Sequence, residues 1–156
     1  MSQEQIIDAS RLIKNSGIKL MLQNMIGLPE GSIKEDLETL KLNMECKPDC
    51  AWVSIYQPYP RTMLGEYCRE KGFYSGDFSE IGPNFFDSSV LNFSAEYKNQ
   101  LANLQKIFGL VVENPRLFNS LDRILSVPHQ DIKLLLEEVY KSYRKQTDAR
   151  IYGFEV

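Results

Sequence analysis

Residues that build metal centres and disulfide frameworks are scarce in this sequence, which has three cysteines and one histidine among its 156 residues. An odd number of cysteines argues against a disulfide framework, and a metal site usually needs three or four ligands. Cys46 and Cys50 have a C-x3-C spacing, but Cys68 stands alone and His129 lies far along the chain. We therefore expect reduced cysteines with a structural role and no metal ligand in this chain.

A net positive charge and long apolar runs are also lacking. The net charge is −3, so no broad positive field would attract nucleic acid or an anionic membrane surface. No apolar run approaches the roughly 18 residues that a membrane-spanning helix needs. Residues 1–13 are polar and mixed, without the apolar core of a secretory signal. These absences favour a cytoplasmic protein without nucleic-acid partners.

What is present at the start of the chain is a helical pattern followed by an apolar run. Apolar residues at helical spacing predict a helix over residues 3–14. The nearly continuous apolar run 18–26 predicts a strand that is covered on both faces. Two glycines and a proline make residues 27–31 a loop, and Ser32 with Glu35 forms a capping box that starts a second helix.

A second strand is predicted over residues 51–56, which are rich in residues that favour strands. Pro58 and Pro60 stop it, and Thr62 caps a short helix that ends at Gly72. The two strands and the helix between them form a βαβ unit, so we expect parallel pairing and a right-handed crossover. The loops after both strands would then lie at one edge of the sheet, where α/β proteins bind ligands.

The second half of the chain changes character. Residues 73–93 look irregular, and only helices are predicted beyond Ser94. Three apolar helix faces are defined in turn by Tyr97, Leu101, Leu104, Phe108 and Val111, by Leu117, Leu121, Ile124 and Leu125, and by Ile132, Leu135, Val139 and Tyr143.

Two buried parallel strands cannot form a self-sufficient sheet. Either the three late helices cover them, or further strands come from chain that precedes this sequence. The opening helix resembles an entry into the middle of a repeating β/α fold, so we favour the second alternative. Cover by the three late helices is the other alternative.

Three segments carry a resemblance to a known family. Residues 16–20 resemble the "aGi.v" entry into a strand, residues 25–32 with Glu35, Asp36 and Thr39 resemble an "iGlPgEt.ed...T" segment, and residues 53–62 resemble an "f.PyPgT" strand end. These are segments of radical S-adenosylmethionine enzymes, and the best match is to the branch with an N-terminal cobalamin-binding domain.

The resemblance implies an α/β fold, the C-terminal part of a partial (β/α)6 TIM-like barrel with two or so parallel strands, followed by an all-helical tail. It covers residues 1–72 with fair specificity and residues 73–156 weakly. The implied division is residues 1–72 as barrel, residues 73–93 as an irregular connection and residues 94–156 as a helical C-terminal extension.

The resemblance also implies a wall of the S-adenosylmethionine site, formed by the loop after the first strand and the end of the second. The residues concerned are Gln23, Met25, Gly27, Leu28, Pro29, Glu30, Tyr56, Gln57 and Pro58. The sequence departs from the family pattern in three places: Gln23 replaces a glycine, Pro29-Glu30-Gly31 replaces Pro-Gly-Glu, and Arg61 replaces the glycine of "PyPgT".

The most important departure is the absence of the family's C-x3-C-x2-C cluster ligands, because Val53 occupies the third position after Cys46 and Cys50. We therefore expect no catalytic or metal-binding residue in this chain. In the complete enzyme, a four-iron four-sulfur cluster would cleave S-adenosylmethionine reductively to a 5′-deoxyadenosyl radical. The resemblance also implies that the complete enzyme binds cobalamin on a separate N-terminal domain and acts on an unidentified small-molecule or lipid-like substrate.

The same residues also have simpler structural interpretations. The 27–31 loop could be an ordinary strand-to-helix turn, and Glu30 could simply favour a helix N-terminus. Trp52 and the phenylalanines at positions 73, 78, 85 and 86 are interpreted as core residues. The main alternative is a non-catalytic α/β interaction module. A phosphate-binding β/α enzyme is disfavoured, since no Lys-Ser/Thr pair follows the loop.

Overall fold

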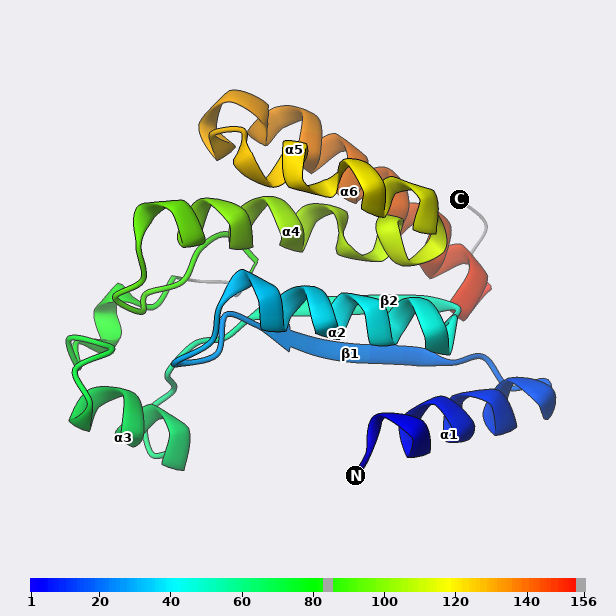
Figure 1. Cartoon of the computed structure of the whole chain (residues 1–156), viewed down its shortest axis with the longest axis horizontal. Helices are drawn as coiled ribbons and strands as arrows, with labels where there is room; N and C mark the ends of the chain where they lie inside the picture. Colours follow the sequence, from blue (N-terminus) through cyan, green and yellow to red (C-terminus); the bar gives the residue numbers. More distant parts are fainter. Residues whose placement is uncertain (83–85, 154–156) are drawn as a thin grey trace.

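The computed structural model describes residues 1–82 and 86–153. Phe85 lies outside the described residues. The elements are α1 (Gln3–Asn15), β1 (Met21–Ile26), α2 (Ile33–Cys46), β2 (Cys50–Ile55), α3 (Met63–Glu70), the 3-10 turn η1 (Phe78–Glu80), α4 (Ala95–Glu113), the 3-10 turn η2 (Pro115–Ser120), α5 (Leu121–Ser126) and α6 (His129–Tyr152) (Figure 1). None of the described helices is both long enough and apolar enough to cross a membrane.

The two strands pair in parallel, with Asn24 opposite Val53 and Ile26 opposite Ile55. The predicted βαβ unit and the mixed α/β class are therefore confirmed. β1 begins at Met21 rather than at residue 18, because the backbone N–H of Leu20 donates to the Asp49 carboxylate (2.9 Å) before the ladder begins.

The predicted helix starts are also confirmed. The backbone N–H of Ser32 donates to Glu35 (3.0 Å), which is one half of the capping box at the start of α2. Hydrogen bonding to the Ser32 side chain lowers the pKa of Glu35. Thr62 accepts the backbone N–H of Gly65 (3.1 Å) and so caps α3. Local sequence thus fixes both helices that follow the two strand ends.

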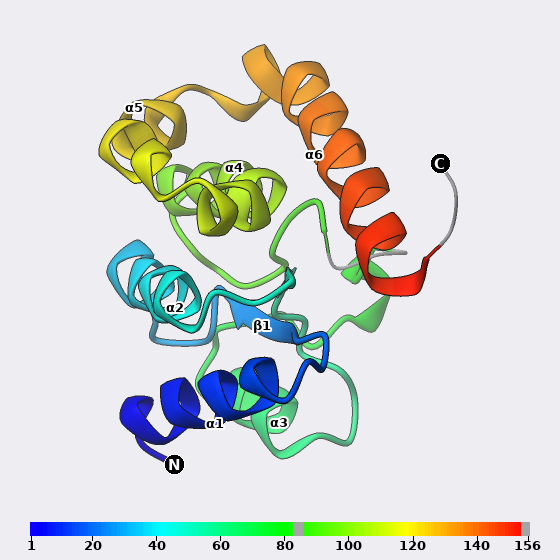
Figure 2. The ribbon, with the colours of Figure 1, turned by 90° about the vertical axis from the view of Figure 1, so that its right-hand side faces the viewer.

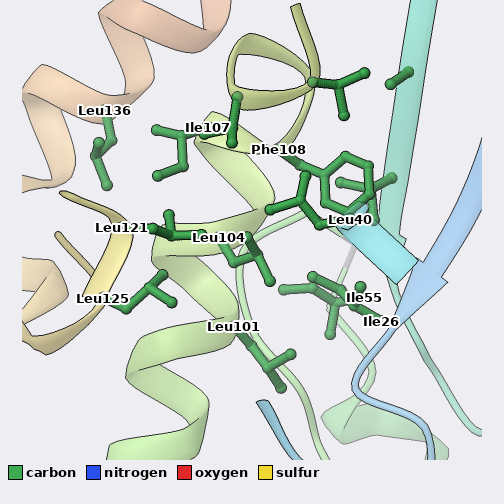
Figure 3. Close-up of a cluster of buried hydrophobic side chains, with 14 of the residues drawn as sticks. Ile26, Leu40, Ile55, Leu101, Leu104, Ile107, Phe108, Leu121, Leu125 and Leu136 are labelled. Atoms are coloured by element: carbon green, nitrogen blue, oxygen red, sulfur yellow. The ribbon is translucent and has the colours of Figure 1, made fainter. Parts of the chain in front are cut away.

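The core lies between one face of the sheet and the late helices. α4 runs across β2 and beside α2, and α5 and α6 lie on its far side (Figures 1 and 2). Figure 3 shows Ile26, Leu40 and Ile55 on one side of α4, and Leu121, Leu125 and Leu136 on the other. The late helices therefore do cover one face of the strand pair, which is the alternative that we disfavoured.

The other face of β1 is open in the described part of the chain. Gln23 is exposed, and Met25 is 47% exposed on the same face. The prediction of a strand covered on both faces is wrong for β1 here. The apolar run indicates that the residues prefer burial, but it does not say which element would bury them.

The outer edge of β2 is occupied by side chains instead of another strand. The Tyr143 hydroxyl of α6 accepts from the Ala51 N–H (3.3 Å) and donates to the Ala51 carbonyl (3.2 Å). Gln105 of α4 donates to the Val53 carbonyl (3.3 Å). α6 comes this close because Gly109 of α4 has no side chain: a Cβ there would lie 2.3 Å from the Tyr143 ring.

The last two predicted helices differ from the structure in detail. The helix expected from Pro115 is split into η2 and α5. On α6, Leu136 and Tyr143 are buried, but Leu135 is 65% exposed although its spacing predicts a place on the buried face. Neighbouring leucines at residues 134–136 make the apolar face of this helix ambiguous from spacing alone.

Candidate functional site

Both strands end at the same rim of the sheet. The Tyr56 N–H donates to the Ile26 carbonyl (2.9 Å), so the last ladder bond joins the two strand ends directly. The loop that starts at Gly27 and the segment that starts at Tyr56 therefore leave the sheet side by side. This is the edge at which parallel sheets place their ligand sites.

Gly27 is fixed between the sheet and α4. Its φ is +69°, and a Cβ would lie 2.9 Å from the Leu101 side chain. Its N–H donates to the buried Asp36 carboxylate (3.0 Å), and the Tyr97 hydroxyl donates to the other oxygen of Asp36 (2.7 Å). Burial raises the pKa of Asp36 against these two bonds, which favour its charged form. The first residue of the loop is thus held by α2 and α4 together.

Glu30 lies on the exposed part of the same loop. Its carboxylate accepts from the Tyr67 hydroxyl of α3 (2.7 Å), and this bond raises the pKa of Tyr67. Its φ is +62°, a conformation that favours glycine, and Arg61 has a φ of +63°. These two positions are where the resembled pattern has glycine, so the backbone keeps a glycine-like conformation at both despite the changed residues.

A cleft of about 400 Å³ opens on the uncovered face of the sheet, at the strand ends. Its lining residues come from β1, β2, the segment after β2 and the start of α3: Met25, Trp52, Ser54, Ile55, Tyr56, Gln57, Tyr59, Thr62 and Leu64. Its volume is within the range of small-molecule sites, about 300–1,000 Å³. Aromatic rings and a few polar groups share its walls, which suits a flat heterocycle better than a purely polar ligand.

Gln57 is the most informative residue of this cleft. Its side chain is 4% exposed, and its Nε2 donates to the Ser88 carbonyl (2.8 Å). The Oε1 atom is buried and has no hydrogen-bond partner among the described residues. A buried acceptor without a donor costs free energy, so a shift of the Gln57 side chain that exposed this oxygen to the cleft would let it accept a ligand N–H or O–H.

Three of the nine predicted site residues meet in this cleft: Met25, Tyr56 and Gln57. The remaining six, Gln23, Gly27, Leu28, Pro29, Glu30 and Pro58, do not line it. Gln23 lies on the same open face of β1, and Asn24 instead bonds Asn43 of α2 (3.0 and 2.7 Å).

Sequence reasoning missed Trp52 and Ser54, which line the cleft beside Met25. The signal was available in the two-residue alternation of the strands. Met25 pairs with Ser54 and Gln23 with Trp52, so all four share one face once the register is known. Trp52 is half-buried and packs edge-on against Phe86 (5.4 Å between ring centroids). Phe73 packs in a small cluster with Tyr56, as expected of a core residue.

The cysteines do not fit an iron–sulfur cluster. All three are buried and unpaired: Cys46 ends α2, Cys50 begins β2, and Cys68 lies in α3 with its Sγ 3.8 Å from the Tyr56 hydroxyl. Within residues 1–82 and 86–153, no three cysteine, histidine or acidic side chains are grouped as a metal site requires. Burial raises the pKa of Cys68, which disfavours the thiolate.

Comparisons of this chain with protein-family models, with characterised proteins and with solved structures find no match. The cleft and the rim described above are therefore the features that bear on the function of this chain.

Proposed function

We propose that this chain is the C-terminal portion of a radical S-adenosylmethionine enzyme and forms part of the wall of its S-adenosylmethionine site. The proposal includes the partial (β/α)6 barrel for residues 1–72 and the helical extension for residues 94–156. The observation that supports it most is the Gln57 cleft, because a buried, unpartnered acceptor lies where two parallel strands end. S-adenosylmethionine carries suitable donors: the adenine amine, the ribose hydroxyls and the ammonium group.

The positions of the motif residues add support. Both glycine positions of the resembled pattern, occupied here by Glu30 and Arg61, keep positive φ. The uncovered sheet face, with Gln23 and Met25, corresponds to the interior of such a barrel. The outward backbone groups of Met21, Gln23 and Met25 have no hydrogen bond to another described element, so this edge of β1 could receive a further strand.

The cluster would have to be held elsewhere, since the cysteines of this chain do not provide its ligands. Cleavage of S-adenosylmethionine to a 5′-deoxyadenosyl radical would need that other part of the enzyme. Within this chain, Gln57 would accept a hydrogen bond from the ligand. The aromatic side chains of Trp52, Tyr56 and Tyr59 would exclude water from the adenine ring of the ligand. Glu30 would shape the rim through its bond to Tyr67.

Calorimetric titration of the chain with S-adenosylmethionine tests this function. We expect saturable binding at one site and a higher melting temperature. Gln57→Leu removes the free acceptor and should weaken binding about tenfold or more, the usual effect of losing a buried hydrogen bond. Gln146→Leu is the matched control, because Gln146 is exposed on α6 and does not line the cleft, and it should bind like the parent.

A folded protein that shows no binding at millimolar S-adenosylmethionine would contradict the proposal. So would equal binding by the Gln57→Leu and Gln146→Leu variants. Either result would favour the non-catalytic interaction module. An in-frame C-x3-C-x2-C in the coding sequence upstream of Met1 is an independent check on the missing cluster ligands.

A further inference from the structure

A second cleft lies among the late helices, away from the sheet. It measures about 390 Å³ and is walled by α4, α5 and α6. It shares no lining residue with the cleft that contains Gln57. The lining residues are Ile107, Leu110, Val111, Leu117, Arg123, Ile124, Val127, Ile132, Leu135, Leu136 and Val139. Figure 3 shows two of them, Ile107 of α4 and Leu136 of α6, beside each other at the helix junction.

The walls of this cleft are almost entirely apolar, and the cleft is open to solvent. Leu135, which lines it, is 65% exposed. Binding of an apolar ligand in such a cleft is favourable, because it removes apolar surface from contact with water. Its volume is again within the range of small-molecule sites, about 300–1,000 Å³.

Positive charge is found at the edge of this cleft. Arg123 carries the only charge among its lining residues, and it makes no ion pair with any described residue. A neighbouring hollow of about 590 Å³ shares Leu110 and Leu117 with the cleft and is also lined by Arg116 and by Glu113, whose carboxylate is paired with Arg150 (2.8 Å). An apolar interior that opens toward guanidinium groups is complementary to a molecule with an apolar chain and an anionic head.

We propose that this cleft binds a single-chain anionic amphiphile, with the alkyl chain among α4, α5 and α6 and the acidic head at Arg123. Walls on three sides favour a flexible chain over a partner helix, which needs a long open groove. The inference does not depend on the proposed S-adenosylmethionine site, because the two clefts are formed by different elements.

The experiment uses the whole chain and displacement of dansyl-labelled undecanoate, followed by fluorescence. The competitors are dodecanoate and dodecyltrimethylammonium, each below its critical micelle concentration, and dodecanol below its solubility limit. We expect one saturable site, with dodecanoate binding about tenfold tighter than dodecanol, because a charged head adds a charge-assisted hydrogen bond. The cationic competitor should bind weakest. Arg123→Gln should remove most of the preference for dodecanoate and leave dodecanol unchanged.

Two neighbouring leucines provide a matched pair of variants. Leu135→Asp places a charge in the cleft and should abolish binding. Leu134→Asp places the same charge one residue away, at a 79% exposed position outside the lining, and should bind like the parent. Both positions are exposed, so both variants should keep the parent's circular dichroism spectrum and melting temperature.

Four results would overturn the inference. The first is no saturable displacement by dodecanoate. The second is equal binding by the Leu134→Asp and Leu135→Asp variants. The third is equal affinity for dodecanoate and dodecanol. The fourth is a dimer in light scattering that Leu135→Asp dissociates, which would make a second copy of the chain the occupant of the cleft.

Discussion

Glu30 and Arg61 hold left-handed backbone conformations although neither is glycine. Such a conformation costs a non-glycine residue roughly 1–2 kcal/mol, so neighbouring contacts must impose it. At Glu30 the contacts include the Tyr67 hydroxyl, and at Arg61 they include the tight turn in which Thr62 donates to the Tyr59 carbonyl (2.8 Å). Both residues mark turns whose shape is fixed by their surroundings.

Alanine substitutions at Gly17 and Gly27 separate the cost of a left-handed backbone from the cost of steric overlap. Gly17→Ala meets nothing within 4 Å and should cost only the conformational penalty at φ +75°, about 1–2 kcal/mol. Gly27→Ala has a similar φ but also overlaps the Leu101 side chain, so we expect about 1–3 kcal/mol more. Urea denaturation of both variants measures the difference. Equal losses would show that α4 does not press on the loop.

Asp36 predicts a pH dependence of stability. Burial raises its pKa above the ordinary value of 3.8, so the folded state holds the proton more tightly than the unfolded state does. The contribution of Asp36 to the free energy of unfolding therefore falls as the pH rises from about 4 through the raised pKa. An asparagine side chain does not titrate, so the Asp36→Asn variant should gain stability relative to the parent between about pH 4 and pH 7. Urea denaturation at several pH values in this range measures the free energy of unfolding of both proteins. A difference between them that does not change with pH would contradict the prediction.

At the scale of single elements, helix α4 connects the two halves of the chain. Its residues from Leu101 to Gly109 are all buried, because the sheet lies on one side and α5 and α6 lie on the other. The sequence predicted the apolar face of this helix correctly. It could not predict that polar residues such as Asn103 and Gln105 would be buried too, since their partners, the carbonyls of Ile124 and Val53, lie 21 and 52 residues away.

The Tyr143 hydroxyl links α6 to β2 through a pair of hydrogen bonds. Tyr143→Phe leaves both backbone groups of Ala51 buried without a partner, so we expect a loss of about 1–3 kcal/mol. Tyr59→Phe is the control, because Tyr59 is exposed and should change stability very little. Thermal unfolding of the two variants gives the comparison. A Tyr143→Phe variant as stable as the control would show that α6 does not satisfy the strand edge.

The elements near the site were predictable from local patterns, and the cleft was not. Apolar runs, proline positions and capping residues located both strands and the helices after them. The cleft needed the register between strands, the position of α3 and the segment around Ser88, all of which depend on contacts between distant residues. Trp52 is therefore interpreted as core from sequence alone, and the free acceptor of Gln57 could not be inferred.

At the scale of the whole molecule, one hydrophobic core spans both halves of the chain. It contains Ile26 and Val53 of the sheet together with Leu104, Leu125 and Leu136 of the helices. Leu125→Ala should therefore lower the stability of the entire fold, by about 2–4 kcal/mol. Trp52 fluorescence reports on the sheet and far-ultraviolet circular dichroism reports mainly on the helices. We expect both to shift to the same new midpoint. Separate midpoints would show that the helical part unfolds as an independent domain.

The side chains along the outer edge of β2 have a consequence for any larger assembly. Because Tyr143 bonds both backbone groups of Ala51 and Gln105 bonds the Val53 carbonyl, additional strands would join more readily at β1 than at β2. A curved sheet that grows in one direction would make a trough instead of a closed cylinder. The slot of that trough would run beside α6, so a bulky molecule could approach the interior sideways rather than over the rim.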